Sequence, residues 1–181
     1  MRDTGVIRRI DELGRIVIPK EIRKTLRIRE GDPLEIYTND GELIFKKYSP
    51  ILNIKDIASG VCDCLYELTE KVCFVTDNDE VLYFSKNKNK DLVGSKNSSA
   101  LDKIIKDRKS VVLSKKDGSE TLSLFNGSNL KMENQIIIPI ISNGDAYGSL
   151  VLYDEKENES IGENEIKLCR LSANVIARYF E

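Results

Sequence analysis

The sequence predicts an α+β protein made of two units of different size. Within the first 50 residues, two short β-type runs, one short helical pattern and one β-hairpin pattern follow one another. The rest of the 181 residues alternates helical stripes with hairpin patterns of antiparallel type. Ser49-Pro50 separates the two patterns, so we expect residues 1–50 and residues 51–181 to form separate domains.

Charge is distributed unevenly along the chain. The whole sequence has a net charge of −2, yet residues 1–30 contain nine basic and five acidic residues, which is a local charge of +4 and leaves −6 for the rest. A basic end on an acidic chain is typical of polyanion binding, although many basic segments are only a solvated face. We therefore expect a nucleic-acid partner. The basic residues are Arg2, Arg8, Arg9, Arg15, Lys20, Arg23, Lys24, Arg27 and Arg29.

The cysteines indicate a reducing compartment. Cys62, Cys64, Cys73 and Cys169 accompany no secretory segment and no twenty-residue apolar run, so we expect a cytoplasmic protein whose thiols are free and partly buried. The chain contains no histidine, which removes the most common general base and a common zinc ligand. We expect no catalytic residue, no metal and no cofactor.

The first unit opens with two β-type runs at residues 6–11 and 15–19. Gly14 lies between them and permits the positive φ that a tight reversal often needs. Pro19 cannot donate to a strand ladder, so it ends the second run, and it suits the first turn of a helix.

A short helix and a hairpin complete this unit. The helix is expected to reach about Leu26, with Ile18, Ile22 and Leu26 recurring every four residues as its buried stripe. Residues 34–38 and 42–46 are expected to pair around the Asn39-Asp40-Gly41 turn. A piece of this size has barely enough apolar surface to fold alone. Two intertwined copies would share one core and close each other's sheet edges, so we expect an obligate dimer.

Residues 4–50 resemble, without a gap, the AbrB-type swapped-hairpin DNA-binding family. The resemblance is carried by residues 4–19 (TGVIRRIDELGRIVIP), 21–26 (EIRKTL), 32–37 (DPLEIY) and 46–48 (KKY). In that family two chains exchange hairpins into a β-barrel dimer that lays a basic surface on double-stranded DNA. By position, the resemblance implies that the DNA contacts come from Arg8, Arg15, Arg23 and Lys24, with Arg9, Arg27 and Arg29 as flanking candidates.

Antitoxins of the same superfold are a competing interpretation of this first unit. They usually carry a short, disordered tail that wraps a toxin. Here a segment with the patterns of an ordered domain follows residue 50, which argues against that role.

The second unit begins with a predicted helix from about residue 51 to residue 70. Its apolar positions have heptad-like spacing. The helix is long enough to connect the domains and to pack against a partner helix in another chain. We expect Val61 and Leu65 to take part in that packing. The apolar positions are Ile54, Ile57, Val61, Leu65 and Leu68, with Ala58 and Cys62 beside them.

Two further hairpins and two helices are expected after it. Residues 72–77 pair with 81–85, residues 136–141 pair with 148–153, a short helix covers 101–105, and residues 111–113 form a strand. A closing helix spans 163–180 and has two apolar stripes, which favours two packing partners. These stripes are Ile166, Cys169, Ala173, Ile176 and Phe180, and Leu168, Leu171 and Val175.

This order of elements resembles a GAF domain. Ile138-Pro139-Ile140, Asn143-Gly144 and Gly148 are similar to its last two strands. GAF domains elsewhere bind small molecules over the sheet, and the sequence names no ligand here. Five aromatic residues could line such a pocket, but aromatic residues in strands more often belong to the core: Phe74, Tyr83, Phe84, Phe125 and Tyr147.

An AbrB-type domain joined to a GAF-like domain resembles the stage V sporulation protein T family. The resemblance implies a regulator of spore development, located at the nucleoid and in the forespore. It also implies assembly through both domains to a homotetramer and a possible small-molecule effector.

Two other function classes remain as alternatives. Some free-standing GAF domains are thiol-dependent methionine sulfoxide reductases, which need exposed thiols of low pKa at a pocket. The cysteines here fall in a predicted helix and in apolar stretches, which argues against this enzyme. A protein-interaction adaptor is the other alternative, and it would require negligible affinity for DNA.

Overall fold

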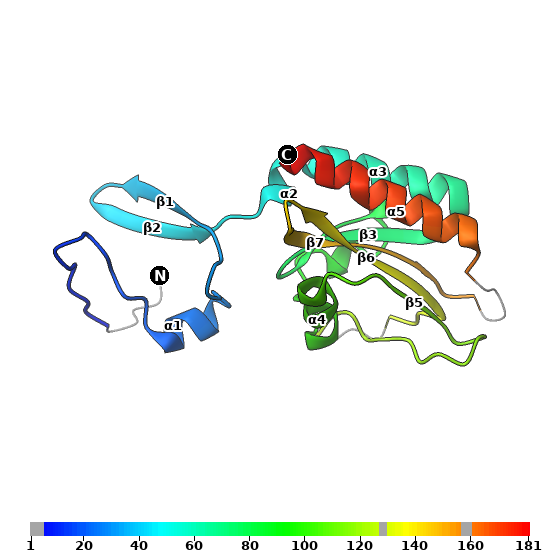
Figure 1. Cartoon of the computed structure of the whole chain (residues 1–181), viewed down its shortest axis with the longest axis horizontal. Coiled ribbons are helices and arrows are strands. Elements are labelled where there is room, and N and C mark those ends of the chain that lie inside the picture. Colours follow the sequence, from blue (N-terminus) through cyan, green and yellow to red (C-terminus); the bar gives the residue numbers. More distant parts are fainter. Residues whose placement is uncertain (1–5, 127–129, 157–160) are drawn as a thin grey trace. The chain divides into compact units, whose positions relative to one another are not determined.

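The computed structural model describes residues 6–126, 130–156 and 161–181. The chain divides into two compact units, Met1–Tyr48 and Ser49–Glu181 (Figure 1). No helix within the described ranges is both long and apolar enough to cross a membrane. The first two residues of the AbrB-type resemblance, Thr4 and Gly5, lie outside the described residues.

The N-terminal unit contains one helix and one hairpin. Helix α1 (Lys20–Thr25) begins after Pro19, and strands β1 (Leu34–Asn39) and β2 (Glu42–Lys47) pair antiparallel. Asp40 and Gly41 form the turn with φ values of 43° and 84°. Two positive φ values in sequence match the twist of a two-residue hairpin loop. The predicted helix and hairpin are confirmed.

The two β-type runs at residues 6–11 and 15–19 are not strands in this structure, so that prediction was wrong for the single chain. A strand needs a neighbour whose N–H and C=O groups complete its ladder. In the described part of this unit, β1 and β2 pair only with each other. The two runs therefore stay without regular pairing, on either side of a turn in which Gly14 has the expected positive φ of 74°.

The prediction of a buried stripe on α1 is also wrong in part. Ile18 and Ile22 are half-buried, but Leu26 is 55% exposed. None of the described residues 6–48 is fully buried, so this helix has no core within its own chain to pack against.

The second unit is a five-stranded antiparallel sheet with helices on both faces (Figure 1). The strand order is β4-β3-β7-β6-β5. Both predicted hairpins, β3 with β4 and β6 with β7, are confirmed, and so are the short helix and the strand after it. The elements are α2 (Pro50–Asn53), α3 (Lys55–Thr69), β3 (Val72–Asp77), β4 (Val81–Phe84), α4 (Ser99–Asp107), β5 (Val111–Ser114), β6 (Asn134–Ser142), β7 (Asp145–Asp154) and α5 (Glu163–Ala177), with short 3₁₀ turns at Ser85–Asn87, Lys90–Leu92 and Arg178–Phe180.

Alternation along the strands divides the core between the two faces of the sheet. In β7, Leu150 and Leu152 belong to a cluster covered by α3 and α5, whereas Val151 and Tyr153 belong to a second cluster with Leu101 of α4. Successive side chains of a strand point to opposite faces. Both faces are apolar, which explains why β6 and β7 are almost continuously hydrophobic.

The first helix of this unit differs from the prediction in two respects. It is interrupted at Ile54, which separates α2 from α3. The residues of α3 that face the sheet are Ala58, Cys62 and Leu65, and they are buried, whereas Leu68 is 70% exposed. Leu65 therefore belongs to the core of its own unit, and the expectation that it packs against another chain was wrong.

The aromatic residues mainly build the core, as expected. The Phe74 ring lies 4.9 Å from that of Phe84 and 5.1 Å from that of Phe125, measured between centroids, and all three are buried. Tyr147 stacks on Phe180 at 4.6 Å. Tyr83 is half-buried and donates its hydroxyl hydrogen to Asp63 of α3. The core interpretation is confirmed for the three phenylalanines.

Gly148 is the point at which the sheet tolerates no side chain. It lies in β7 opposite Asp77 and Ile140, with φ of 155°, and an added Cβ would stand 2.0 Å from the backbone oxygen of Thr76. We expect Gly148→Ala to lower the free energy of unfolding of the second unit by about 3 kcal/mol, because overpacking and an unfavourable φ each cost on the order of 1–3 kcal/mol. Denaturant unfolding measures this change.

Gly60→Ala is the matched control for this substitution. Gly60 lies in α3 with open space around its Cα, and alanine there is expected to stabilise the helix by about 0.5–1 kcal/mol. Equal unfolding midpoints for the two variants would contradict the steric argument.

Candidate nucleic-acid interface

The turn at residues 11–15 is held by several hydrogen bonds. Asp11 Oδ1 accepts hydrogen bonds from the backbone N–H groups of Leu13 at 3.0 Å and Arg15 at 2.8 Å. The backbone adds bonds from Gly14 N to Asp11 O and from Asp11 N to Arg15 O. One aspartate side chain therefore supports a reversal that would otherwise leave these N–H groups to water.

The same carboxylate contacts the side chain of Arg15. Arg15 Nε donates to Asp11 Oδ2 at 2.7 Å. The bonds from the Arg15 backbone N–H, and next from its guanidinium, hold the pKa of Asp11 below its ordinary value. Asp11 was not among the DNA-contact candidates; the Asp-x-x-x-Arg spacing was present in the sequence but does not by itself reveal a turn that brings the two side chains together.

Helix α1 presents two of the candidates to solvent. Arg23 and Lys24 are exposed in its last turn. Their positive charge is favourable at this end of a helix, where unpaired carbonyl groups carry partial negative charge. Arg8 and Arg9 are exposed in the unpaired run that precedes the turn.

Arg27 differs from the other candidates because a lysine side chain of β2 donates a hydrogen bond to its backbone carbonyl oxygen. It has a φ of 52° and is half-buried. Its carbonyl oxygen accepts a hydrogen bond from Lys47 Nζ at 3.0 Å, and the same ammonium group lies 3.0 Å from Asp32 Oδ2. Lys47 thus ties the end of β2 to the segment that follows α1. The flanking candidate Arg29 is exposed.

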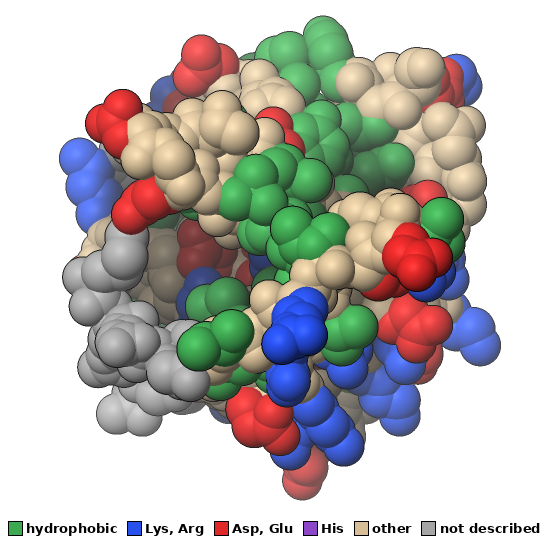
Figure 2. All heavy atoms as spheres, turned by 90° about the vertical axis from the view of Figure 1, so that its left-hand side faces the viewer, with side chains coloured by type: hydrophobic (Ala, Val, Ile, Leu, Met, Phe, Trp, Pro, Cys, Tyr) green, Lys and Arg blue, Asp and Glu red, His purple; other side chains and the backbone are tan. Residues whose placement is uncertain are grey.

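Apolar side chains accompany these basic residues on the surface of the N-terminal unit. Figure 2 faces this unit and shows hydrophobic side chains exposed beside lysine and arginine side chains. Contiguous exposed apolar surface is uncommon on a soluble monomer and marks an interaction surface. The exposed apolar residues here are Val6, Ile7, Ile10, Leu13, Ile16, Val17, Leu26, Ile36, Tyr37, Leu43, Ile44, Phe45 and Tyr48.

The thiols of the second unit have the environment of core residues. Cys62, Cys73 and Cys169 are buried, and Cys64 is exposed on α3. Burial raises the pKa of Cys73 well above its ordinary value and that of Cys169 to about 12. Thiols of raised pKa are poor nucleophiles. Cys73 and Cys169 therefore lack the reactivity that a thiol-dependent reductase needs.

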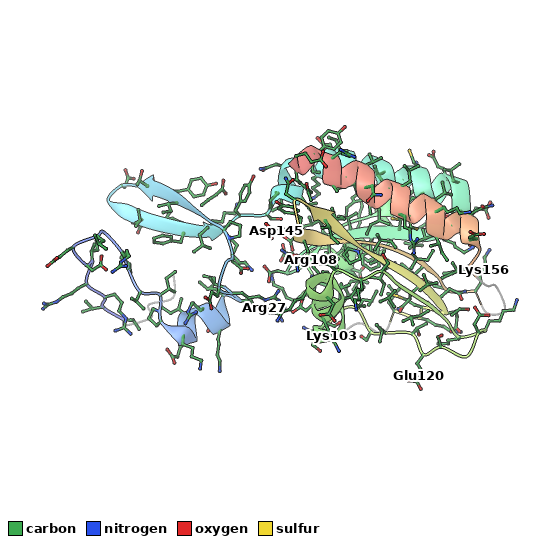
Figure 3. All side chains as sticks on the ribbon, in the orientation of Figure 1. Arg27, Lys103, Arg108, Glu120, Asp145 and Lys156 are labelled. Carbon is green, nitrogen blue, oxygen red and sulfur yellow. The ribbon has the colours of Figure 1, made fainter. Side chains whose placement is uncertain are left out.

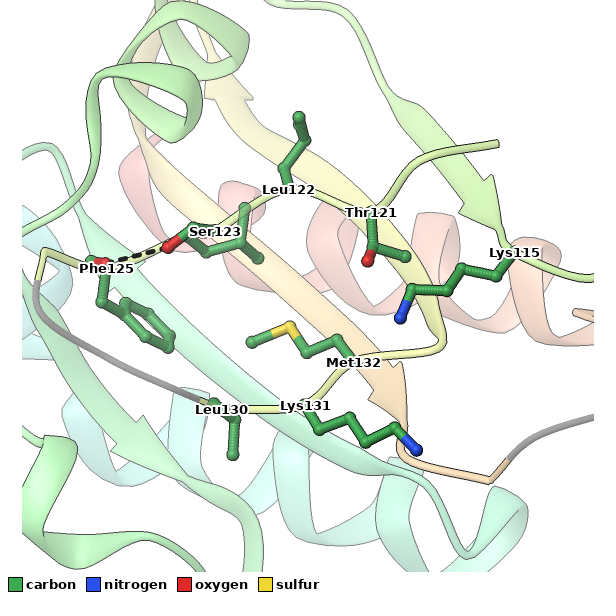
Figure 4. Close-up of a pocket in the computed structure, with 9 residues that line it drawn as sticks. Lys115, Thr121, Leu122, Ser123, Phe125, Leu130, Lys131 and Met132 are labelled. Carbon is green, nitrogen blue, oxygen red and sulfur yellow. Dashed lines mark hydrogen bonds between the residues drawn. The ribbon is translucent and has the colours of Figure 1, made fainter. Parts of the chain in front are cut away.

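A cavity of about 170 Å³ lies between residues 121–125 and residues 130–132 (Figure 4). Lys115 and Lys131 line it, and both ammonium groups approach Glu133 Oε1, at 2.9 and 3.5 Å. Sites for small molecules usually enclose about 300–1,000 Å³. This cavity is smaller than that, and Glu133 lies close to both of its lysines. A more open hollow of about 410 Å³ is lined by Lys115, Gly118, Ser119, Glu120 and Thr121.

Comparison with known proteins identifies relatives of both units. A family model described as "Stage V sporulation protein T C-terminal, transcription factor" matches residues 53–181, and one described as "Antidote-toxin recognition MazE, bacterial antitoxin" matches residues 7–53. Stage V sporulation protein T of Bacillus subtilis is 41% identical over 182 residues, which cover 100% of this chain and 99% of that protein.

The two units also have separate relatives. The transition state regulatory protein AbrB of Bacillus subtilis is 58% identical over 50 residues, which are 28% of this chain and 52% of that protein. The GAF-B domain of DevS from Mycobacterium smegmatis superposes with a TM-score of 0.54 at 12% identity, over 70% of this chain and 91% of that one. The second likeness concerns the fold alone and confirms the GAF-like architecture.

These relatives confirm a regulator and not an enzyme. The match to an antitoxin model is confined to residues 7–53, and everything after it matches the description of a transcription factor. The full-length identity covers both units in one alignment. The chain belongs to the stage V sporulation protein T family of transcription factors.

Proposed function

We propose that this sporulation transcription factor binds double-stranded DNA through residues 1–50 and uses residues 51–181 for assembly and for sensing. The observation that carries the proposal is the exposure of basic side chains on a unit whose apolar side chains are exposed as well. The basic side chains supply contacts to phosphate. The apolar ones supply the contact to a second chain.

The proposed DNA contacts are made by four residues in each chain. Arg8, Arg15, Arg23 and Lys24 are all exposed, and Arg9 and Arg27 flank them. At position 24, lysine presents a compact point charge where arginine would present a planar fork of donors, so this contact is proposed to hold a phosphate and not to read a base.

The proposed DNA-binding form is an intertwined dimer. In it, residues 6–11 and 15–19 would find the strand neighbours that they lack within one chain. The exposed apolar side chains of the N-terminal unit would then form a core shared by both copies. This arrangement doubles the basic residues on one surface to eight.

Gel shifts of the full chain at increasing salt test this function. If all eight residues contact phosphate, the slope of log K against log[salt] is expected to be near about −7, and half occupancy gives about −4. Negligible affinity for DNA at every salt concentration would leave an adaptor role as the better account.

We propose that the second unit joins two such dimers into a homotetramer. Helices α3 and α5 lie side by side on one face of the sheet (Figure 1). Leu68 of α3 and Leu171 of α5 are 70% and 61% exposed, and Val175 is exposed as well. Helices that keep apolar residues on an outer face commonly pack against other helices. The tetramer would set the spacing between its two DNA-binding dimers.

The double variant Leu68→Asp/Leu171→Asp is expected to reduce the tetramer to dimers. Affinity for a long duplex with two binding sites should fall by about 100-fold, because joining two sites raises avidity by about 10²–10⁴. Affinity for a short duplex with one site should stay the same. Analytical ultracentrifugation and gel shifts with the two duplexes measure these effects.

Val93→Asp is the control for this double variant. Val93 is an exposed apolar residue that follows the 3₁₀ turn at Lys90–Leu92, so the substitution adds a charge to the same unit on an element other than α3 and α5. A double variant that remains a tetramer would contradict the proposed helix contact.

We also propose that the protein acts at the nucleoid, in the forespore, and that a small-molecule effector adjusts the tetramer. An effector shifts an equilibrium between two packings only by the difference in its affinity for them. Such a ligand would have to enlarge the cavity of about 170 Å³ or bind elsewhere, for example in the more open hollow of about 410 Å³ beside Lys115 and Thr121. Native mass spectrometry of protein purified from its own cells would reveal both the oligomer mass and any retained ligand.

A further inference from the structure

We propose that Asp11 is a positioning residue for DNA recognition, which orients the guanidinium of Arg15 toward the DNA. The inference rests on the proposed DNA-binding function and goes beyond it. It assigns a role in DNA binding to an acidic side chain, which by charge alone would oppose DNA.

The two carboxylate oxygens of Asp11 serve different functions. Oδ1 accepts from the backbone N–H groups of Leu13 and Arg15, and Oδ2 accepts from Arg15 Nε at 2.7 Å. The first pair of bonds shapes the turn. The second bond fixes the arginine side chain on that turn.

The bond to Asp11 uses only one of the donors of Arg15. A guanidinium has five N–H donors, and Nε carries one of them. The four others lie on the two terminal nitrogens: one points in the same direction as Nε–H, and two point outward from the end of the group. The Arg15 side chain is 72% exposed, compared with 42% for Asp11. The terminal fork is therefore accessible to a phosphate or to the edge of a guanine.

Fixing this side chain before binding improves affinity for a matched site. A flexible arginine loses side-chain entropy when DNA immobilises it, and preorganisation reduces that loss. The contacts of Asp11 and Arg15 lie within one turn of one chain, so they do not depend on how the second copy is placed. A dimer carries two such pairs.

Positioning and simple charge predict opposite signs for Asp11→Asn. Asparagine keeps Oδ1 as an acceptor for the turn, but its amide nitrogen cannot accept from Arg15 Nε. If Asp11 is only a negative charge near DNA, its neutralisation should strengthen binding to every duplex. If Asp11 positions Arg15, binding to a preferred sequence should weaken.

The experiment compares full-length variants on two DNA probes. One is a duplex enriched by the wild-type protein from a random-sequence library, and the other is poly(dI-dC). For Asp11→Asn we expect about tenfold weaker binding to the enriched duplex and unchanged or tighter binding to poly(dI-dC). In an Arg15→Ala background, Asp11→Asn should cause no further weakening on the enriched duplex.

Glu12→Gln is the matched control, because it removes the same charge one residue along from an exposed side chain. We expect it to tighten binding to both probes slightly. Equal or tighter binding of Asp11→Asn to the enriched duplex would overturn the positioning role. Loss of binding to both probes would also overturn it, since it would assign Asp11 to the fold of the turn.

The wild-type measurement separates this inference from the proposed function. Wild-type protein without salt-dependent DNA binding would overturn the proposed function, and this inference with it. Normal wild-type binding together with an unaffected Asp11→Asn variant would overturn the positioning role alone.

Discussion

Arg23→Ala is expected to weaken binding of the full chain to DNA by about sixtyfold at 0.1 M salt. Each dimer would lose two phosphate contacts, and each contact contributes about 0.9 to the slope of log K against log[salt], so the slope should flatten by about two units. At 1 M salt the ionic contribution to binding vanishes. Over the tenfold fall from 1 M to 0.1 M salt, a slope difference of about 1.8 corresponds to a sixtyfold loss of affinity. Gel shifts over a salt series measure both quantities.

The fold should be unaffected, because Arg23 is exposed on α1. Lys103→Ala serves as the control: it removes one exposed positive charge from α4 in the second unit (Figure 3). We expect that variant to keep the wild-type slope. An Arg23→Ala protein with the wild-type slope would remove this residue from the interface.

The second unit could be predicted from the sequence almost element by element. Its hairpins combine short apolar runs rich in β-branched residues with turn residues such as Asn143-Gly144, and both signals are local. Ser98 illustrates the same point for a helix, since its side chain accepts from Leu101 N at the start of α4. Local chemistry and tertiary packing agree in this unit because it contains its own core.

The side of α3 that faces the sheet could not be predicted. Ile57, Val61 and Leu68 have the spacing of a helix seam, and so do Ala58, Cys62 and Leu65. The buried set is the second one. A sheet face accepts small residues such as Ala58 closely, whereas a spacing rule that favours large apolar residues selects the neighbouring face.

Residues 6–19 show a different limit of sequence analysis. The runs at residues 6–11 and 15–19 have β-type composition, and the sequence indicates where they reverse, but a strand exists only where a neighbour completes its ladder. The contact between Asp11 and Arg15 was missed for a related reason. It depends on a turn that brings positions 11 and 15 together through several backbone bonds at once.

Residues 1–50 produced alone are expected to be folded only as a dimer, and Ile7→Asp is expected to abolish that fold. Ile7 is 89% exposed in the single chain, so aspartate there would be harmless if the monomer were the complete structure. In the proposed intertwined dimer the same position would be covered by the second copy, and an unpaired charge buried there would cost about 3–5 kcal/mol, twice per dimer. Few domains of this size could compensate for such a loss.

Sedimentation equilibrium and circular dichroism over a range of concentrations measure the outcome. Ile7→Val provides the matched control, since it keeps an apolar side chain and typically costs only about 0.5–1.5 kcal/mol in a core. The wild-type fragment should lose structure as it dissociates on dilution, because the separated chain has no buried residue among those described between positions 6 and 48. A folded monomer whose signal does not depend on concentration, equally stable with Ile7 or with Asp at position 7, would show that the exposed apolar surface does not serve a second copy.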